Sequence, residues 1–135
     1  MDDPLEVQLS RLIIQDKADQ QFIHLRERFG DRSFPIVIGF NEAWEIQSKL
    51  LKQRTRRPMT HDLIGSILRA LECQIRRVVI TELRDNTFFA VLVLHLPHED
   101  QERDVDCRPS DAIALAVQMG VPIFVARKVL DEAAS

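Results

Sequence analysis

The sequence is poor in cysteine and lacks the short motifs that mark several large enzyme classes. Its two cysteines, Cys73 and Cys107, stand far apart, and neither belongs to a Cys-x-x-Cys pair. They provide neither a disulfide framework nor a four-ligand zinc site, so we expect two reduced thiols in or near the core. A glycine-rich phosphate loop, a Gly-x-Ser-x-Gly elbow and a His-Glu-x-x-His helix are also absent, which excludes the sites that these motifs define.

Long hydrophobic runs are missing as well. The longest apolar stretch, residues 88–96, is interrupted by His95 and is too short to span a bilayer. The first four residues, Met-Asp-Asp-Pro, are acidic and include no apolar segment of the kind found in signal peptides. We therefore expect a cytoplasmic protein that does not enter a membrane.

The charge balance excludes a protein that coats nucleic acid by bulk charge, because the formal net charge is −3. Aromatic residues make up only 6% of the chain and form no interleaved run that would stack bases. One dense basic tract covers residues 49–57, and its Lys52, Arg54 and Arg56 are candidates for a nucleic-acid path. The alternative is a solvated helix end, where cations also suit the helix dipole.

What is present describes an ordinary globular chain, with 45% hydrophobic and 29% charged residues in a length of 135. We expect a single domain over residues 1–135 with a core of about 5–132. The hydrophobic pattern predicts an α+β fold, in which a mixed, mostly antiparallel sheet packs with three main helices. Strands are expected at 5–14, 21–28, 34–38, 74–83, 87–96, 103–107 and 121–125. Helices are expected at 42–53, 61–71 and 109–119, with a short final helix at 127–133.

Local sequence signals refine the strands. The alternation of apolar and polar residues slips near Ser10, which indicates a bulge in the first strand. A turn is expected at residues 16–19, and residues 84–86 are predicted to form a three-residue hairpin loop. Residues 88–94 are apolar on both faces, which is typical of a central strand.

Other signals refine the helix ends. Asn41 and Thr60 are predicted to cap the first two helices, because their side chains accept hydrogen bonds from the first turn. Gly120 follows the third helix at the position where glycine usually ends one.

Two helix starts are candidates for phosphate binding. The first turn of a helix presents unpaired N–H groups and a partial positive charge, and an adjacent arginine adds a bidentate contact to phosphate. Arg57 with Thr60 and Arg108 with Ser110 supply this arrangement twice. The alternative is plain capping, because proline, serine, threonine and aspartate are what any helix start prefers.

Carboxylates near these helix starts are candidates for a metal site. Asp104 and Asp106 project from one face of a predicted strand, and Asp111 follows in the next helical turn. Asp62 and Glu42 lie in the first turns of two other predicted helices. Oxygen ligands of this kind suit Mg²⁺ or Mn²⁺, which can activate water against a phosphodiester. The alternative is that the first-turn carboxylates only answer helix dipoles and that Asp104 is solvated.

His61 is the histidine that is the strongest candidate for a chemical role. It stands beside Asp62 in a predicted first turn, where it could act as a general base or a metal ligand. The alternative is an exposed histidine with no role.

Five segments, taken in order, resemble the bifunctional nuclease (BFN) domain family. They are Phe-Pro-Ile-Val-Ile-Gly at 34–39, Glu-Ala at 42–43, Arg-Pro-Met-Thr-His-Asp-Leu at 57–63, Asp-Cys-Arg-Pro-Ser-Asp-Ala-Ile-Ala-Leu-Ala at 106–116 and Pro-Ile at 122–123. The match covers roughly residues 5–132, and several spaced motifs in one order are far more specific than any one of them. The chain is similar to the stand-alone bacterial members of the family.

The resemblance implies a nuclease, because plant members are described as having both DNase and RNase activity. We therefore expect an enzyme that hydrolyses phosphodiester bonds of DNA and RNA with a divalent metal, Mg²⁺ or Mn²⁺. The matching motifs contain the polar residues that we expect to act. The expected catalytic residues are Asp106, Asp111 and His61. The candidate metal ligands are Glu42, Asp62, Asp106 and Asp111, and the candidate phosphate-binding residues are Arg57, Thr60, Arg108 and Ser110.

Two alternatives to the enzyme stay open at this point. One is a non-catalytic nucleic-acid-binding or regulatory module that uses the basic tract 49–57. The other is an oligomeric scaffold, with a homodimer as the expected form, in which the short strand near Val121 offers a free edge to a partner.

Overall fold

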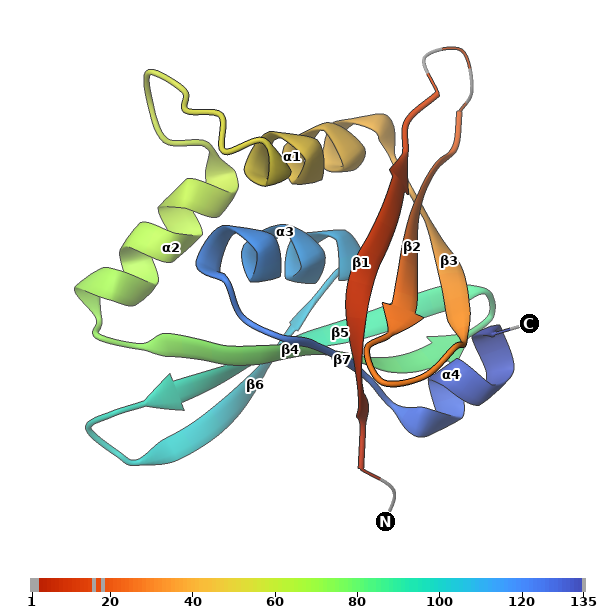
Figure 1. Cartoon of the computed structure of the whole chain (residues 1–135). Coiled ribbons are helices and arrows are strands. Elements are labelled where there is room, and N and C mark those ends of the chain that lie inside the picture. The colour runs from red at the N-terminus through yellow and green to blue at the C-terminus, as the bar shows by residue number, and fades with distance from the viewer. Residues whose placement is uncertain (1–2, 16, 18, 135) are drawn as a thin grey trace.

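In the described part of the chain, seven strands form one mixed sheet in the order β3-β2-β1-β7-β4-β5-β6. The structure is a computed structural model that describes residues 3–15, 17 and 19–134 (Figure 1). The strands are β1 (Leu5–Ile13), β2 (Gln21–Glu27), β3 (Ser33–Ile38), β4 (Gln74–Arg84), β5 (Thr87–Leu96), β6 (Gln101–Cys107) and β7 (Ile123–Val125). Only β4 and β7 pair in parallel in the described sheet, and the other neighbours are antiparallel. The predicted α+β fold with a mixed, mostly antiparallel sheet is therefore confirmed.

The N-terminal strands follow their predicted pattern closely. In β1 the register with β2 shifts between Leu9 and Arg11, so the bulge predicted near Ser10 is confirmed. The Ser10 hydroxyl donates a hydrogen bond to the carbonyl of His24 at 3.1 Å. The turn expected at 16–19 lies partly outside the described residues. Pro35 is tolerated in β3 because this strand forms one edge of the sheet.

The β4–β5 hairpin corrects one expectation and confirms another. Its loop has two residues rather than three, because Arg84 pairs with Thr87 in the ladder. Asp85 and Asn86 make this tight turn with φ values of 52° and 59°, which is the backbone of a type I′ turn and suits these two residue types. The predicted central strand is confirmed, because β5 lies between β4 and β6.

The short strand β7 is not an edge. It lies between β1 and β4 in the middle of the sheet, so the expectation that the segment near Val121 offers a free edge to a partner chain is wrong. The reason is its connection: the chain passes through α3 and returns β7 alongside β4, where both of its edges find a partner.

The helices among the described residues are α1 (Phe40–Leu50), α2 (Thr60–Ala70), α3 (Pro109–Met119) and α4 (Arg127–Ala133). Two predicted caps are wrong. Gly39 caps α1, because its carbonyl accepts the first helical hydrogen bond from Ala43 at 3.0 Å. Met59 caps α2 in the same way, through the N–H of Leu63 at 2.9 Å. The end of α3 at Gly120, which has a φ of 70°, is as predicted.

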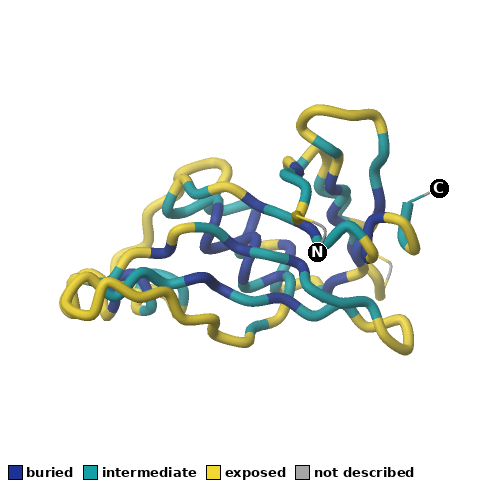
Figure 2. The backbone as a smooth tube through the Cα atoms, turned by 90° about the horizontal axis from the view of Figure 1, so that it is seen from below, coloured by how far each residue is buried: buried dark blue, intermediate teal, exposed yellow. Residues whose placement is uncertain are grey.

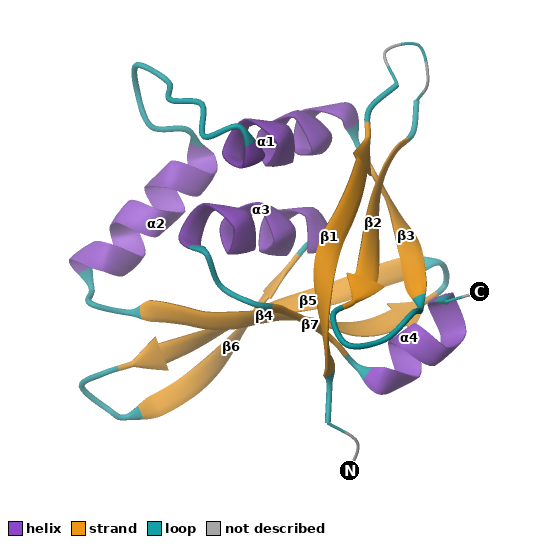
Figure 3. Ribbon diagram, viewed as in Figure 1, coloured by secondary structure: helices purple, strands orange, loops and turns teal. Residues whose placement is uncertain are grey.

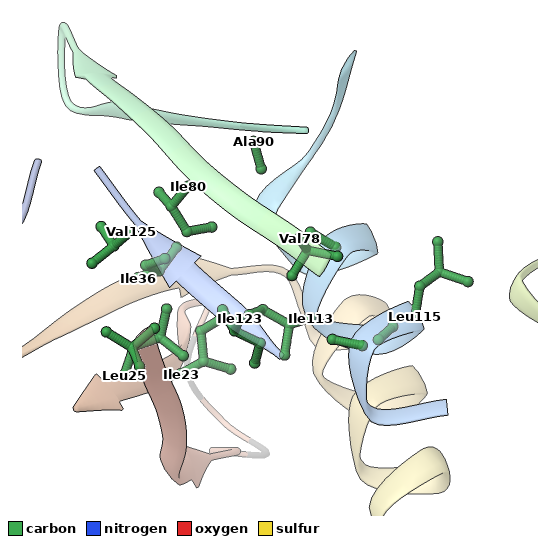
Figure 4. Close-up of a cluster of buried hydrophobic side chains, with 14 of the residues drawn as sticks. Ile23, Leu25, Ile36, Val78, Ile80, Ala90, Ile113, Leu115, Ile123 and Val125 are labelled. Carbon is green, nitrogen blue, oxygen red and sulfur yellow. The ribbon is translucent and has the colours of Figure 1, made fainter. Parts of the chain in front are cut away.

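The core places α3 between the sheet and the other helices. It packs on β4 and β5 on one side and on α1 and α2 on the other, and residues 112–116 are all buried. Ile23, Ile113 and Ile123 lie together where the N-terminal strands meet this helix (Figure 4). Buried residues run through the middle of the strands and helices, whereas the hairpin tips and the long connection before α2 are exposed (Figure 2).

The arrangement of α1 and α3 determines where the candidate site forms. The two helices lie side by side on one side of the sheet, and both begin at the end nearer β3 (Figure 1 and Figure 3). The connection from α1 to α2, residues 51–59, lies at the opposite end of α1. None of the helices in the described part of the chain is long and apolar enough to cross a membrane.

Candidate active site

A groove of about 790 Å³ opens where α1 and α3 begin. Its walls come from the end of β3, the first turn of α1, the β4–β5 turn, the end of β6 and the first turn of α3. The residues that line it are 35–39, Glu42, 86–89 and 106–111. The groove therefore collects the Phe-Pro-Ile-Val-Ile-Gly, Glu-Ala and Asp-Cys-Arg-Pro-Ser-Asp segments, which are distant in sequence.

Two helix starts face this groove. Gly39 caps α1 and Arg108 caps α3, both with extended backbone. Pro109 suits the first helical position because its missing N–H would have no partner there. The unpaired N–H groups of both first turns add positive potential at one point, and Glu42 and Asp111 supply negative charge in the same two turns.

Arg108 is held over the groove by two carboxylates. Its Nε and Nη2 donate to Oδ2 and Oδ1 of Asp111, each at 3.0 Å, and its Nη1 donates to Oε2 of Glu42 at 3.2 Å. These hydrogen bonds, those to Asp111 first, raise the pKa of Arg108 above its ordinary value. The side chain remains 62% exposed. Because a guanidinium has five N–H donors, two remain for a ligand in the groove.

Asp111 anchors this arginine. Burial is the largest single influence on its pKa and raises it, but the hydrogen bonds from Arg108 and His61 together outweigh burial and leave the pKa below the ordinary value. Asp111 is therefore ionised near neutral pH. With both of its oxygens accepting hydrogen bonds, it orients Arg108 rather than accepting a proton.

His61 lies behind the groove instead of lining it. Its Nε2 is 3.0 Å from Oδ1 of Asp111, and its Nδ1 is 3.2 Å from Oε1 of Glu45. The second separation is within hydrogen-bond range but lacks the alignment of one, so neither atom has a hydrogen-bond partner in the described structure. The imidazole is only 12% exposed, so the alternative of an exposed histidine is wrong. The structure places it one residue away from the groove.

The side chain of Asp62 lies outside the groove, between α1 and α2. Its Oδ1 accepts a hydrogen bond from the Nζ of Lys49 at 2.5 Å, and its Oδ2 accepts one from the backbone N–H of Met59 at 2.9 Å. The hydrogen bond from Lys49, followed by that from Met59, lowers the pKa of Asp62 below its ordinary value. Asp62 thus joins the end of α1 to the start of α2 and does not line the groove.

The structure does not bring the four predicted metal ligands to one point. Glu42 and Asp111 are both bonded to Arg108, and Asp62 is bonded to Lys49. Asp106 lines the groove on its exposed side. Across the residues that the structure describes, no group of three or more histidine, cysteine, aspartate or glutamate side chains is placed to hold a metal ion. A divalent ion would have to compete with these cations, so the arrangement does not fit a preformed metal site.

Cys107 also lines the groove. Burial raises the pKa of its thiol to about 12, with further contributions from the carboxylates of Asp111 and Asp106. The thiol therefore stays protonated near neutral pH and is a poor nucleophile. The expectation of two reduced thiols agrees with the structure, in which Cys73 and Cys107 are both free.

The second predicted phosphate site lies elsewhere. Arg57 is exposed on the connection before α2, and Thr60 is the exposed first residue of that helix. The predicted nucleic-acid path of Lys52, Arg54 and Arg56 is exposed on the same connection. An eleven-residue helix such as α1 is about 16 Å long, and this helix separates the connection from the groove (Figure 1).

Sequence reasoning missed Glu45 and Gln118. Glu42, Glu45 and Lys49 are spaced by three and four residues, which aligns them on one side of α1. Gln118 follows Asp111 by two helical turns on α3, and its Nε2 donates to the carbonyl of His61 at 3.1 Å. Polar residues at helical spacing were the available signal.

Gly65 allows this contact between α2 and α3. A Cβ atom at this position would lie 2.9 Å from Nε2 of Gln118, which is too close without a shift of that side chain. The glycine therefore brings α2 near enough to α3 for the carbonyl of His61 to receive its hydrogen bond.

The fold and the groove define a small α+β domain with an arginine in a surface groove, and comparison with known proteins gives its family. The family described as "Bifunctional nuclease domain" matches residues 23–135, which is most of the chain. The protein therefore belongs to the bifunctional nuclease domain family, as its motifs predicted.

Individual relatives fall into two groups. A Mycobacterium tuberculosis (strain ATCC 25618 / H37Rv) protein, described only as uncharacterized, is 38% identical over 128 residues, which are 95% of this chain and 75% of the relative. Bifunctional nuclease 1 of Oryza sativa subsp. japonica and a bifunctional nuclease of Oryza minuta are each 28% identical over 120 residues. These residues are 87% of this chain but 36% of each rice protein, so the chain spans little more than a third of their length.

Proposed function

We propose that the protein is a nuclease that hydrolyses phosphodiester bonds of DNA and RNA in the groove between the starts of α1 and α3. The observation that carries this proposal is Arg108, which lines a groove at the starts of two helices and keeps two N–H donors that are not bonded to Asp111 or Glu42. A phosphate is the ligand that such an arrangement favours. Family membership and the names of the rice relatives support the same reaction.

The residues of the groove suggest distinct roles. Arg108 would bind the phosphate and stabilise the negative charge that grows on its oxygens as water attacks phosphorus. Ser110, which is 6% exposed in the first turn of α3, would place its backbone beside the same phosphate. Asp106 lines the groove and forms no ion pair with a described residue, so it would accept the proton of the attacking water.

Two expected contributions remain predictions. His61 contacts Asp111, which lines the groove, but it does not line the groove itself. Its direct role in proton transfer therefore stays a prediction. The requirement for Mg²⁺ or Mn²⁺ also stays a prediction, and none of the roles above depends on an ion.

A cleavage assay tests the proposal. Purified protein is incubated with labelled single-stranded DNA and RNA in Mg²⁺, Mn²⁺ or EDTA, and fragments are separated on a gel. We expect cleavage that falls strongly in Asp106→Ala, while Asp104→Ala retains activity. Asp104 is the matched control because it is exposed two residues earlier on the same strand and does not line the groove. Equal cleavage by both variants would place the reaction elsewhere or reveal a contaminant.

A non-catalytic nucleic-acid-binding role has one observation in its favour. Lys52, Arg54, Arg56 and Arg57 are exposed, and none of them forms an ion pair within the described part of the chain. Free cations of this kind bind a phosphate backbone with strong dependence on salt. In a salt titration of single-stranded DNA binding, Arg54→Ala/Arg56→Ala would lower the slope without any cleavage being seen. Binding that ignores salt would count against this role.

The expected homo-oligomer also remains a prediction. One feature that favours it is the outer side of α2, where Met59, Leu63, Ile67 and Leu71 recur every four residues and are all about half exposed or more. Size-exclusion chromatography with light scattering at high protein concentration tests it. We expect a dimer that Leu63→Glu dissociates, and a monomer at all concentrations would remove the prediction.

A further inference from the structure

A line of polar side chains leads from the middle of α1 to the groove. Oε1 of Glu45 lies 3.2 Å from Nδ1 of His61, and Nε2 of His61 lies 3.0 Å from Oδ1 of Asp111. Asp111 then accepts two hydrogen bonds of 3.0 Å from Arg108. Glu45 is on α1, His61 on α2 and Asp111 on α3, and Arg108 is the cap of α3, so the line joins these three helices.

We propose that Glu45 is a positioning residue, which acts through His61 and Asp111 to hold Arg108 in the orientation that binds phosphate. This inference rests on the proposed function, since it concerns the same groove. Glu45 does not itself line the groove, and two side chains, those of His61 and Asp111, separate it from Arg108.

Burial along the line supports this role. Glu45 is 19% exposed, His61 12% and Asp111 24%, whereas Arg108 is 62% exposed. The inner members are thus packed in place, and only the last one reaches solvent. The backbone of His61 is fixed as well, because its carbonyl accepts the hydrogen bond from Gln118. A rigid support of this kind reduces the freedom that Arg108 would otherwise lose on binding a phosphate.

The chemistry of the imidazole explains why Glu45 matters for orientation. The ring can donate to both of the carboxylates that it faces only when each of its nitrogens carries a proton, because with a single N–H it can donate to only one of them. The carboxylate of Glu45 on the Nδ1 side and that of Asp111 on the Nε2 side hold the ring between them. If Glu45 were removed, the ring would be free to rotate, and Asp111 would lose the hydrogen bond that fixes its Oδ1. The two hydrogen bonds to Arg108 would then lose their alignment.

A purely structural role is the competing explanation, because Glu45 also lies 3.7 Å from the Nζ of Lys49, four residues further along α1. The values of kcat and KM distinguish this structural role from the positioning role. A structural defect lowers the folded fraction and therefore the apparent kcat, with KM unchanged. Misplacement of Arg108 weakens phosphate binding and therefore raises KM, and it also lowers kcat to the extent that Arg108 stabilises the transition state.

The test compares Glu45→Ala, Glu45→Gln and Glu102→Gln, measuring kcat and KM on a single-stranded DNA oligonucleotide. Glu102 is the control because it pairs with Arg77 on the exposed end of β6, outside the groove. We expect Glu45→Ala to raise KM about tenfold. Glu45→Gln should retain most of the function, because its amide keeps the shape and can hydrogen-bond to Nδ1. Glu102→Gln should match the wild type. A fall in kcat alone for Glu45→Ala would overturn the proposal.

A double-mutant cycle that combines Glu45→Ala with Arg108→Ala is the second test of the proposal. If Glu45 acts through Arg108, then Glu45→Ala has no further effect on oligonucleotide binding once Arg108 is gone. An undiminished effect in the Arg108→Ala background would overturn the inference. Fluorescence anisotropy measures this binding without requiring cleavage.

An NMR measurement keeps the inference testable even if the proposed function fails. In the free protein we expect slow solvent exchange of the Arg108 Nε–H, because it is bonded to Asp111, and faster exchange in Glu45→Ala but not in Glu102→Gln. Absence of cleavage with this result would refute the nuclease proposal and retain the positioning role. Unchanged exchange in Glu45→Ala would refute the positioning role itself.

Discussion

The chain has two helices that follow an Arg-Pro pair, and the structure gives the two pairs different surroundings. At α3, Arg108 is the cap and Asp111 is the third helical residue, so the arginine and the aspartate are three positions apart and bond directly. At α2, Arg57 lies two residues before the cap, which is Met59. Asp62 is again the third helical residue, but its cation is Lys49 from α1.

The difference shows how little of a site a local motif determines. Both pairs precede a helix, and both helices carry a first-turn aspartate. Within the described residues, the arginine bonds to the aspartate of its own helix at α3 and not at α2, and at α3 the start of α1 adds Glu42 and helps to line the groove. Arg57 stays exposed on a long connection, where a side chain loses more freedom on binding and is more strongly screened by salt.

The largest effect is expected from removing Arg108, and comparison with Arg57 tests whether only one of these arginines binds substrate in the groove. Arg108→Ala removes the donors that face a phosphate, and we expect cleavage to fall about 100-fold, or about 2.7 kcal/mol in the barrier. Arg57→Ala should stay within about threefold of the wild type, as expected for an exposed contact that is screened by salt. Steady-state cleavage of one oligonucleotide by the two variants measures both. An equal loss in Arg57→Ala would mean that the two helix starts form one substrate path.

The two first-turn aspartates should contribute differently to the free energy of unfolding, and we expect the larger contribution from Asp111. Asp111→Asn removes charge-assisted hydrogen bonds from Arg108 and His61, which should lower the free energy of unfolding by about 2 kcal/mol at pH 7. The pKa of Asp111 is lowered from an ordinary value of 3.8. Its contribution is therefore present above pH 3.8 and is lost as the pH falls through the folded-state pKa.

Urea unfolding at pH 7 and at low pH measures this contribution. The difference in the free energy of unfolding between the wild type and Asp111→Asn should be large at pH 7. It should disappear at low pH, as Asp111 of the wild type becomes protonated. Other carboxylates titrate in both proteins, so the difference isolates Asp111. A difference that stays constant with pH would show that the loss comes from packing and not from the ionised carboxylate.

The sequence predicts the elements of this fold better than it predicts the site, and the reason is physical. Alternation and helical spacing depend on near neighbours, so the strands, the bulge near Ser10 and the end of α3 at Gly120 are recoverable. The caps at Asn41 and Thr60 fail by one or two residues because backbone geometry, not side-chain preference, determines where each helix begins.

The candidate site depends on contacts between distant segments. The motifs identify Arg108, Asp111 and Asp106, which do meet in the groove. They do not reveal that His61 is turned toward Glu45, or that Lys49 is the partner of Asp62. Those contacts follow from the packing of three helices, and a single sequence offers only the spacing of Glu42, Glu45 and Lys49 as a hint.

The smallest expected effect concerns the other first-turn aspartate. Asp62→Asn keeps an acceptor for the N–H of Met59 but removes the charge that binds Lys49, so we expect a loss of about 1 kcal/mol in the free energy of unfolding at pH 7. The pKa of Asp62 is lowered from an ordinary value of 3.8, so this loss should also disappear as the pH falls below that value. Cleavage should remain near the wild-type level, because Asp62 does not line the groove. If Asp62→Asn instead abolished cleavage without destabilising the fold, the start of α2 would belong to the active site, and the distinction between the two Arg-Pro helix starts would fail.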